Sequence, residues 1–160
     1  MESWDTFAVV VGGASAALLG LLFVAISIRL EVIAASMELR NRAAQTLVLF
    51  GSALVVAILL SLPGQPLAVF GVELMVLAVG TGGGLYLLDR RAGHPPNGAP
   101  LARVLDVVSP NTVTSVLFFA AGVVLTFGVR AALYAIVVPV LATFVGGVAS
   151  AWLFMIRARE

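Results

Sequence analysis

Long runs of apolar residues, separated by short polar segments, dominate the chain. The runs cover residues 7–28, 43–62, 67–88 and 113–156. A helix that crosses a hydrocarbon core of about 30 Å needs about 20 apolar residues, so each of the first three runs fits one crossing. At about 1.5 Å per residue, the fourth run is roughly twice too long for one crossing. We therefore expect the fourth run to fold back on itself.

The turn in the fourth run is predicted at its only charged residue, Arg130, which follows Gly128 in the segment TFGVRAALY. The predicted fold class is thus all-α, a polytopic transmembrane helix bundle that forms a single domain over residues 1–160. The five predicted spans cover residues 7–28, 43–62, 67–88, 111–128 and 132–156. Residues 89–110 form the one substantial loop, predicted to be cytoplasmic.

The arginines orient these spans. All nine basic residues are arginine. With five spans, Arg130 lies on one side of the membrane and all the others lie on the opposite side. The others are Arg29, Arg40, Arg42, Arg90, Arg91, Arg103, Arg157 and Arg159. Because positively charged loops are retained in the cytoplasm, the N-terminus is expected outside and the C-terminus inside, in a plasma or inner membrane.

Local signals mark several helix boundaries. The segment SMEL at 36–39 indicates the start of the second helix, below the membrane surface. Ser109 and Pro110 suit the cap and first turn of the fourth helix. The segment LPGQPL at 62–67 predicts a short external turn. Within the loop, residues 101–108 fit either a short helix on the inner leaflet or a mere lead into the fourth span.

The composition excludes several classes of function. The chain is 61% hydrophobic and 11% charged, with no cysteine and one histidine. We find no metal-ligand spacing, no phosphate-binding loop and no pair of intramembrane acids, so we expect no enzyme activity, no metal and no other cofactor. Nucleic-acid binding lacks a basic domain to support it.

Small and hydroxyl-bearing residues recur three, four or seven apart, a spacing that allows membrane helices to pack closely. On the first span these are Gly13, Ala16, Gly20 and Ser27, and on the second Thr46, Ala53 and Ala57. On the third the stripe joins Glu73, Gly80 and Gly84. The fourth span offers Ser115, Gly122 and Thr126, and the fifth Pro139, Thr143, Gly146 and Ser150. Each stripe is expected to pack against a helix or to line a solvent path.

Glu73 is the strongest candidate for a functional residue, because charged groups at membrane depth are costly. It is expected about a third of the way into the hydrocarbon core from outside. Three interpretations remain open: an ion pair with Arg130 or a carboxylate that reaches to the surface, a proton or cation site, and a contact between chains. Thr143 joins Glu73 and Arg130 as a candidate for transport or ion binding.

The arginines at the inner surface serve first as topological anchors. They are also candidates for contacts with anionic lipid headgroups. The residues concerned are Arg40, Arg42, Arg90, Arg91 and Arg157.

Two functions remain open from the sequence. The leading interpretation is a small homo-oligomeric protein that acts as a channel or carrier for an ion or small solute, because an acid, hydroxyl stripes and glycine-rich spans occur with almost no extramembrane domain. One bundle has few helices with which to enclose a path, so this function requires two or more copies. The alternative is a non-transporting accessory or scaffold subunit, whose small-residue faces bind partner membrane subunits.

Overall fold

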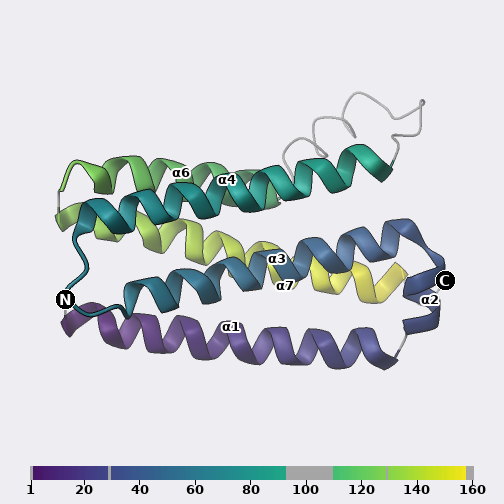
Figure 1. The fold of residues 1–160 in the computed structure, drawn as a ribbon. Coiled ribbons are helices and arrows are strands. Elements are labelled where there is room, and N and C mark those ends of the chain that lie inside the picture. Colours follow the sequence, from purple (N-terminus) through teal and green to yellow (C-terminus); the bar gives the residue numbers. More distant parts are fainter. Residues whose placement is uncertain (1, 29, 93–109, 129, 158–160) are drawn as a thin grey trace.

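The computed structural model describes residues 2–28, 30–92, 110–128 and 130–157. Those residues contain helices and no strand, and the long helices lie side by side in one bundle (Figure 1). The helices are α1 (Glu2–Ile28), α2 (Leu30–Ala35), α3 (Met37–Leu60), α4 (Leu67–Ala92), α6 (Pro110–Thr126), the 3-10 helix η1 (Arg130–Ile136) and α7 (Val137–Arg157). We call the end where α1 and α4 begin the N-terminal end of the bundle, and the opposite end the C-terminal end.

Four segments are long and apolar enough to cross a membrane. They are Trp4–Ile28, Leu39–Leu60, Leu67–Gly84 and Ala131–Trp152. The segment Asn111–Thr126 in α6 is apolar but shorter. The all-helical prediction is therefore confirmed, and the four long apolar helices identify a multi-pass membrane protein.

The connection between α1 and α3 contains one element that the sequence analysis missed. The short helix α2 lies between the two long helices, and its Ile33 packs against Ala43 of α3. Ser36 then caps α3 with extended backbone angles, and its hydroxyl oxygen accepts a hydrogen bond from the backbone N–H of Leu39. The predicted helix start at 36–39 is confirmed, because a serine at this position satisfies a backbone donor that the first turn leaves free.

The predicted short turn after α3 is also present. Ser61 ends α3, and the chain reverses through Gly64, whose φ of 70° is readily adopted only by glycine. Helix α4 then continues to Ala92. Residues 89–92, expected at the start of the loop, therefore belong to the last turn of α4. The helix predicted as one alternative at 101–108 lies outside the described residues.

The fourth apolar run folds back near the predicted position. Helix α6 begins at Pro110, as expected, and ends at Thr126, and Gly128 has a φ of 74° at the turn. The expected span at 132–156 starts as the 3-10 helix η1 and becomes α-helical only at Val137. Pro139 lies in the first turn of α7, where its missing N–H has no helical partner in any case.

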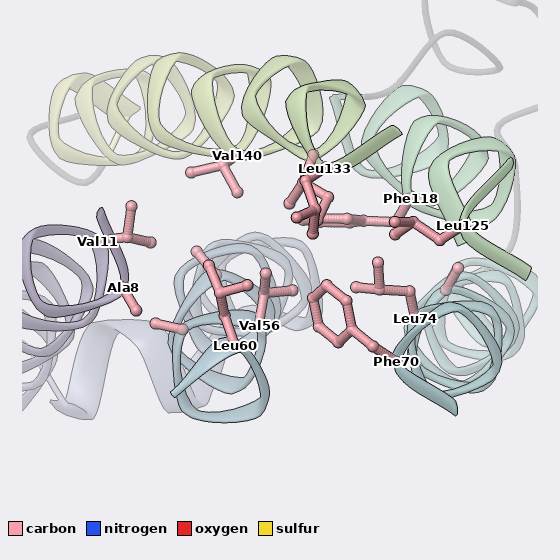
Figure 2. Packing of buried hydrophobic residues seen from close by; sticks show 14 of the residues in the cluster. Ala8, Val11, Val56, Leu60, Phe70, Leu74, Phe118, Leu125, Leu133 and Val140 are labelled. Carbon is pink, nitrogen blue, oxygen red and sulfur yellow. The ribbon is translucent and has the colours of Figure 1, made fainter. Parts of the chain in front are cut away.

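Helix α3 is the central element of the bundle. It packs against α1, α4 and α7, while α4 packs chiefly against α6, which lies beside part of its length (Figure 1). The apolar core gathers toward the N-terminal end, and Figure 2 shows side chains from the long helices and η1 meeting there. Examples are Val56 on α3, Leu74 on α4 and Leu125 on α6. At the same end, the ring of Trp4 meets that of Tyr134 edge to face at 5.2 Å between centroids.

Glycines allow a close backbone contact between α4 and α6. A Cβ added to Gly71 would lie 2.6 Å from the carbonyl oxygen of Gly122, and one added to Gly122 would lie 2.7 Å from that of Gly71. Both distances are well below normal contact, so the two backbones touch directly at this crossing. Between α3 and α7, a Cβ added to Gly147 of α7 would lie 2.5 Å from the ring of Phe50.

Candidate functional site

Glu73 lies on α4, six residues after the helix begins. At about 1.5 Å per residue, this places it about 9 Å from the N-terminal end of that helix. Its carboxylate Oε2 accepts a hydrogen bond from the side-chain amide of Gln65. Gln65 precedes α4, in the turn that reverses at Gly64. The turn therefore folds over the start of α4 and supplies a donor to the acid.

Glu73 keeps hydrogen-bonding capacity beyond its bond to Gln65. Its side chain is half-buried, and the amide of Gln65 donates one hydrogen bond without neutralising the charge. An ionised carboxylate offers about four lone-pair positions, so most of them stay available. The residues that continue its face of α4, Gly80 and Gly84, are both exposed. The acid thus borders a surface that no other helix of the described chain covers.

The two other transport candidates differ in how the structure places them. Arg130 begins η1 at the N-terminal end of the bundle, the same end as Glu73, but its side chain lies outside the described residues. The predicted ion pair between them stays a prediction. Thr143 is fully buried in α7, and its hydroxyl donates to the carbonyl oxygen of Pro139 at 2.7 Å. This bond within its own helix commits the hydroxyl proton of Thr143.

Other hydroxyls on the predicted stripes also bond within their own helices. Thr46 donates to the carbonyl oxygen of Arg42 at 3.0 Å, and Thr126 donates to that of Val123 at 2.6 Å. Such bonds satisfy a polar group at membrane depth without a partner from another helix. The hydroxyls of Thr46 and Thr126 therefore have hydrogen-bond partners without facing a solvent path.

The predicted small-residue stripes fall into two groups. Those on α3, α6 and α7 turn into the bundle: Thr46, Ala53, Ala57, Gly122 and Gly146 are all buried. Those on α1 and α4 turn outward, and a Cβ added to Gly13, Gly20, Gly80 or Gly84 meets nothing within 4 Å. Contact of these four glycines with another helix stays a prediction, because no helix of the described residues lies against them.

The arginines proposed to touch lipid headgroups belong to helix ends at the C-terminal end of the bundle (Figure 1). Arg40 is exposed and Arg42 half-buried near the start of α3. Arg90 and Arg91 end α4, and Arg157 ends α7, although the side chains of these three lie outside the described residues. The arrangement brings the five residues to one end, and their contact with anionic lipid stays a prediction.

A polar cluster between α3, α4 and α6 was missed by the sequence analysis, which named only Ser115 of its members. The polar side chains that line a small cavity there are Ser52, Thr81, Asn111, Thr114 and Ser115. Thr81 and Ser115 approach to 3.5 Å between their oxygens, beside Gly82. The available signal was an asparagine at the start of an apolar helix, which is easily assigned to the preceding loop.

No group of three or more potential metal ligands occurs among the residues that the structure describes. Comparisons with protein families, with characterised proteins and with solved structures found no match to this chain. The chemistry of the described side chains is therefore the basis for any function assigned to it.

Proposed function

We propose that the chain crosses the membrane five times, with its N-terminus outside and its C-terminus inside a plasma or inner membrane. Helix α6, at 17 residues, is the shortest crossing. At about 1.5 Å per residue it is about 25 Å long, close to the thickness of the hydrocarbon core. The two chain ends lie at opposite ends of the bundle, as an odd number of crossings requires (Figure 1). The arginines collected at the C-terminal end support the orientation.

The proposed function is transport of a proton, a cation or a small solute by a homo-oligomer of this chain. One observation carries the proposal: Glu73 is half-buried at membrane depth, on a face of α4 whose glycines are uncovered. A carboxylate at this depth is costly in contact with lipid, and a lipid-facing helix gains nothing from glycine. A second copy of the chain packed on this face would shield the acid and use the glycines.

Transport requires more than one copy for a geometric reason. The polar cavity between α3, α4 and α6 has a volume of about 10 Å³, and the hydroxyl of Thr143 is already bonded within α7. Such a cavity is far too small for a route across the membrane. A path between copies, bordered by Glu73, fits the exposed position of its face.

A non-transporting accessory subunit is the second candidate, and one observation favours it. Helix α1 packs chiefly on α3, and only 17% of its membrane segment is buried, against 50% for α3. Its outward face carries Gly13 and Gly20, with space around both. A peripheral helix with an uncovered small-residue face suits attachment to a helix of another protein.

Reconstitution distinguishes the two functions. The chain is purified in mild detergent, its mass is measured, and it is placed in liposomes that carry proton, sodium or potassium gradients. A homo-oligomeric transporter is expected to dissipate at least one gradient. Glu73→Gln keeps the shape and the bond to Gln65 available but removes the charge, so it should abolish that flux. Asp5→Asn, at an exposed acid near the start of α1, is the matched control and should retain it.

The flux and co-purification results distinguish a transporter from an accessory subunit. Equal flux from wild type and Glu73→Gln, with both proteins assembled alike, would remove Glu73 from the transport path. Absence of flux, together with stoichiometric co-purification of other membrane proteins, would establish the accessory function instead.

A further inference from the structure

The polar cavity between α3, α4 and α6 has the properties of a binding site for a small molecule. It has a volume of about 10 Å³ and lies on the side of the core toward the C-terminal end. A cavity of about 10–15 Å³ is the smallest that holds one water molecule, and only a polar cavity does so. Five of its eight lining residues carry hydroxyl or carboxamide groups. The cavity therefore has the size and the chemistry of a site for a single water.

The side chain of Asn111 independently indicates that a hydrogen-bonding molecule lies in the cavity. This side chain lines the cavity, and the residue is only 5% exposed. Its Oδ1 nevertheless has no hydrogen-bond partner among the described residues. Buried polar atoms almost always find a partner in protein or water. Turning the carboxamide over would place N–H donors in the same position, so the demand for a partner persists in either orientation.

The neighbouring hydroxyls complete the site. Thr81 donates its proton to the carbonyl oxygen of Leu77 at 2.8 Å, and Ser52 donates to that of Leu49 at 2.7 Å. Both oxygens keep lone pairs that accept a hydrogen bond. We propose that one water molecule occupies the cavity, donates to Oδ1 of Asn111 on α6 and to the hydroxyl oxygen of Thr81 on α4 or Ser52 on α3, and so links α6 to a second helix.

The surroundings favour water over a metal cation. None of the lining residues is charged, so nothing would balance a positive charge at this depth. Asn111 is the second residue of α6, and the start of a helix carries partial positive charge. Water can donate hydrogen bonds to the unpaired carboxamide oxygen of Asn111 and to hydroxyl oxygens whose own protons are already donated to backbone carbonyls.

The bound water would have a structural role that the apolar core does not fill. The core of the bundle gathers toward the N-terminal end, where Gly71 and Gly122 bring α4 and α6 into contact. Beyond it, Thr81 and Ser115 approach to only 3.5 Å. A bridging water there ties α6 to α4 or to α3 in this half of the bundle.

Solid-state NMR of the protein in lipid bilayers tests the proposal. Labelling asparagine and threonine allows magnetisation transfer from water to be followed at Asn111 and Thr81. Transfer to both is expected to build up faster than to Thr143, which is fully buried and does not line the cavity. In Asn111→Leu, which fills the cavity, transfer to Thr81 should fall to the rate seen at Thr143. Asn41→Leu, at the other asparagine in the described helices, is the matched control and should leave it unchanged.

Two results would overturn the assignment. One is slow transfer to Asn111 and Thr81 in the wild-type protein, which needs no variant to fold and would indicate a dry cavity. The other is a carboxamide resonance of Asn111 that shifts when sodium chloride replaces choline chloride, which would place a cation in the site instead.

Discussion

Replacing Gly71 by alanine tests the contact between α4 and α6. The added Cβ would lie 2.6 Å from the carbonyl oxygen of Gly122, 2.9 Å from the backbone nitrogen of Thr126 and 3.1 Å from the Cβ of Leu125. Two of these atoms are backbone and none is the end of a flexible side chain. The helices must therefore move apart by several tenths of an ångström, which also loosens the apolar core around Leu74.

The expected loss of stability follows from two opposing terms. Forcing an extra methyl group into a packed site costs about 1–3 kcal/mol. Alanine favours a helix over glycine by about 0.8–1.0 kcal/mol in water, which offsets part of that cost. We therefore expect Gly71→Ala to lower the free energy of unfolding by up to about 2 kcal/mol.

Equilibrium unfolding in mixed micelles, at increasing mole fraction of denaturing detergent, measures this change. Trp4 packs on Phe7 and Tyr134 at the N-terminal end, so its fluorescence reports on the core in a Trp152→Phe background. The control is Gly51→Ala on α3, because a Cβ there meets nothing within 4 Å. It should be neutral or stabilising. Equal stability of Gly71→Ala and the control would refute the close approach of α4 and α6.

Further substitutions test three other contacts. Gly147→Ala should destabilise the protein, because its Cβ would meet the ring of Phe50 at 2.5 Å. Adding Phe50→Leu, which supplies a smaller side chain, should restore much of the lost stability in the same unfolding assay. Ser36→Ala removes the cap of α3 and should cost about 0.5–2 kcal/mol, whereas Ser36→Gly should cost only a few tenths, so equal losses would contradict the capping bond. Gln65→Ala removes the described donor to Glu73 and should lower the flux measured in liposomes, and an unchanged flux would show that the amide does not position the acid.

The sequence predicted helix type and approximate boundaries well, because membrane length and backbone chemistry constrain both. It predicted the packing face of α3, where Thr46, Ala53 and Ala57 are the small residues on one side and are all buried. On α1 small residues occur on every side of the segment GGASAA, so spacing could not select a face. The structure uses Gly12, which approaches Ala57, and leaves Gly13 outward.

The candidate site was predictable only in part. Glu73 stands out because a charge inside an apolar run is rare, but its partner Gln65 lies in a turn whose path no periodicity describes. The cavity joins Ser52, Thr81 and Asn111 from three helices that are far apart in the sequence. Each residue is unremarkable alone, and only the packing of α3, α4 and α6 brings them together.

Accessibility of single cysteines tests the central claim, the five crossings with opposite ends, most directly. The natural chain has no cysteine, so each introduced thiol reports alone. Asp5, Leu62 and Phe127 are exposed at the N-terminal end of the bundle and Met37 at the other. Cysteines at the first three positions should react with a membrane-impermeant maleimide in intact cells from which the cell wall has been removed. Cysteines at Met37 and after the last residue should react only once the membrane is permeabilised. A protected cysteine at Phe127, or a C-terminus that reacts in intact cells, would contradict the account.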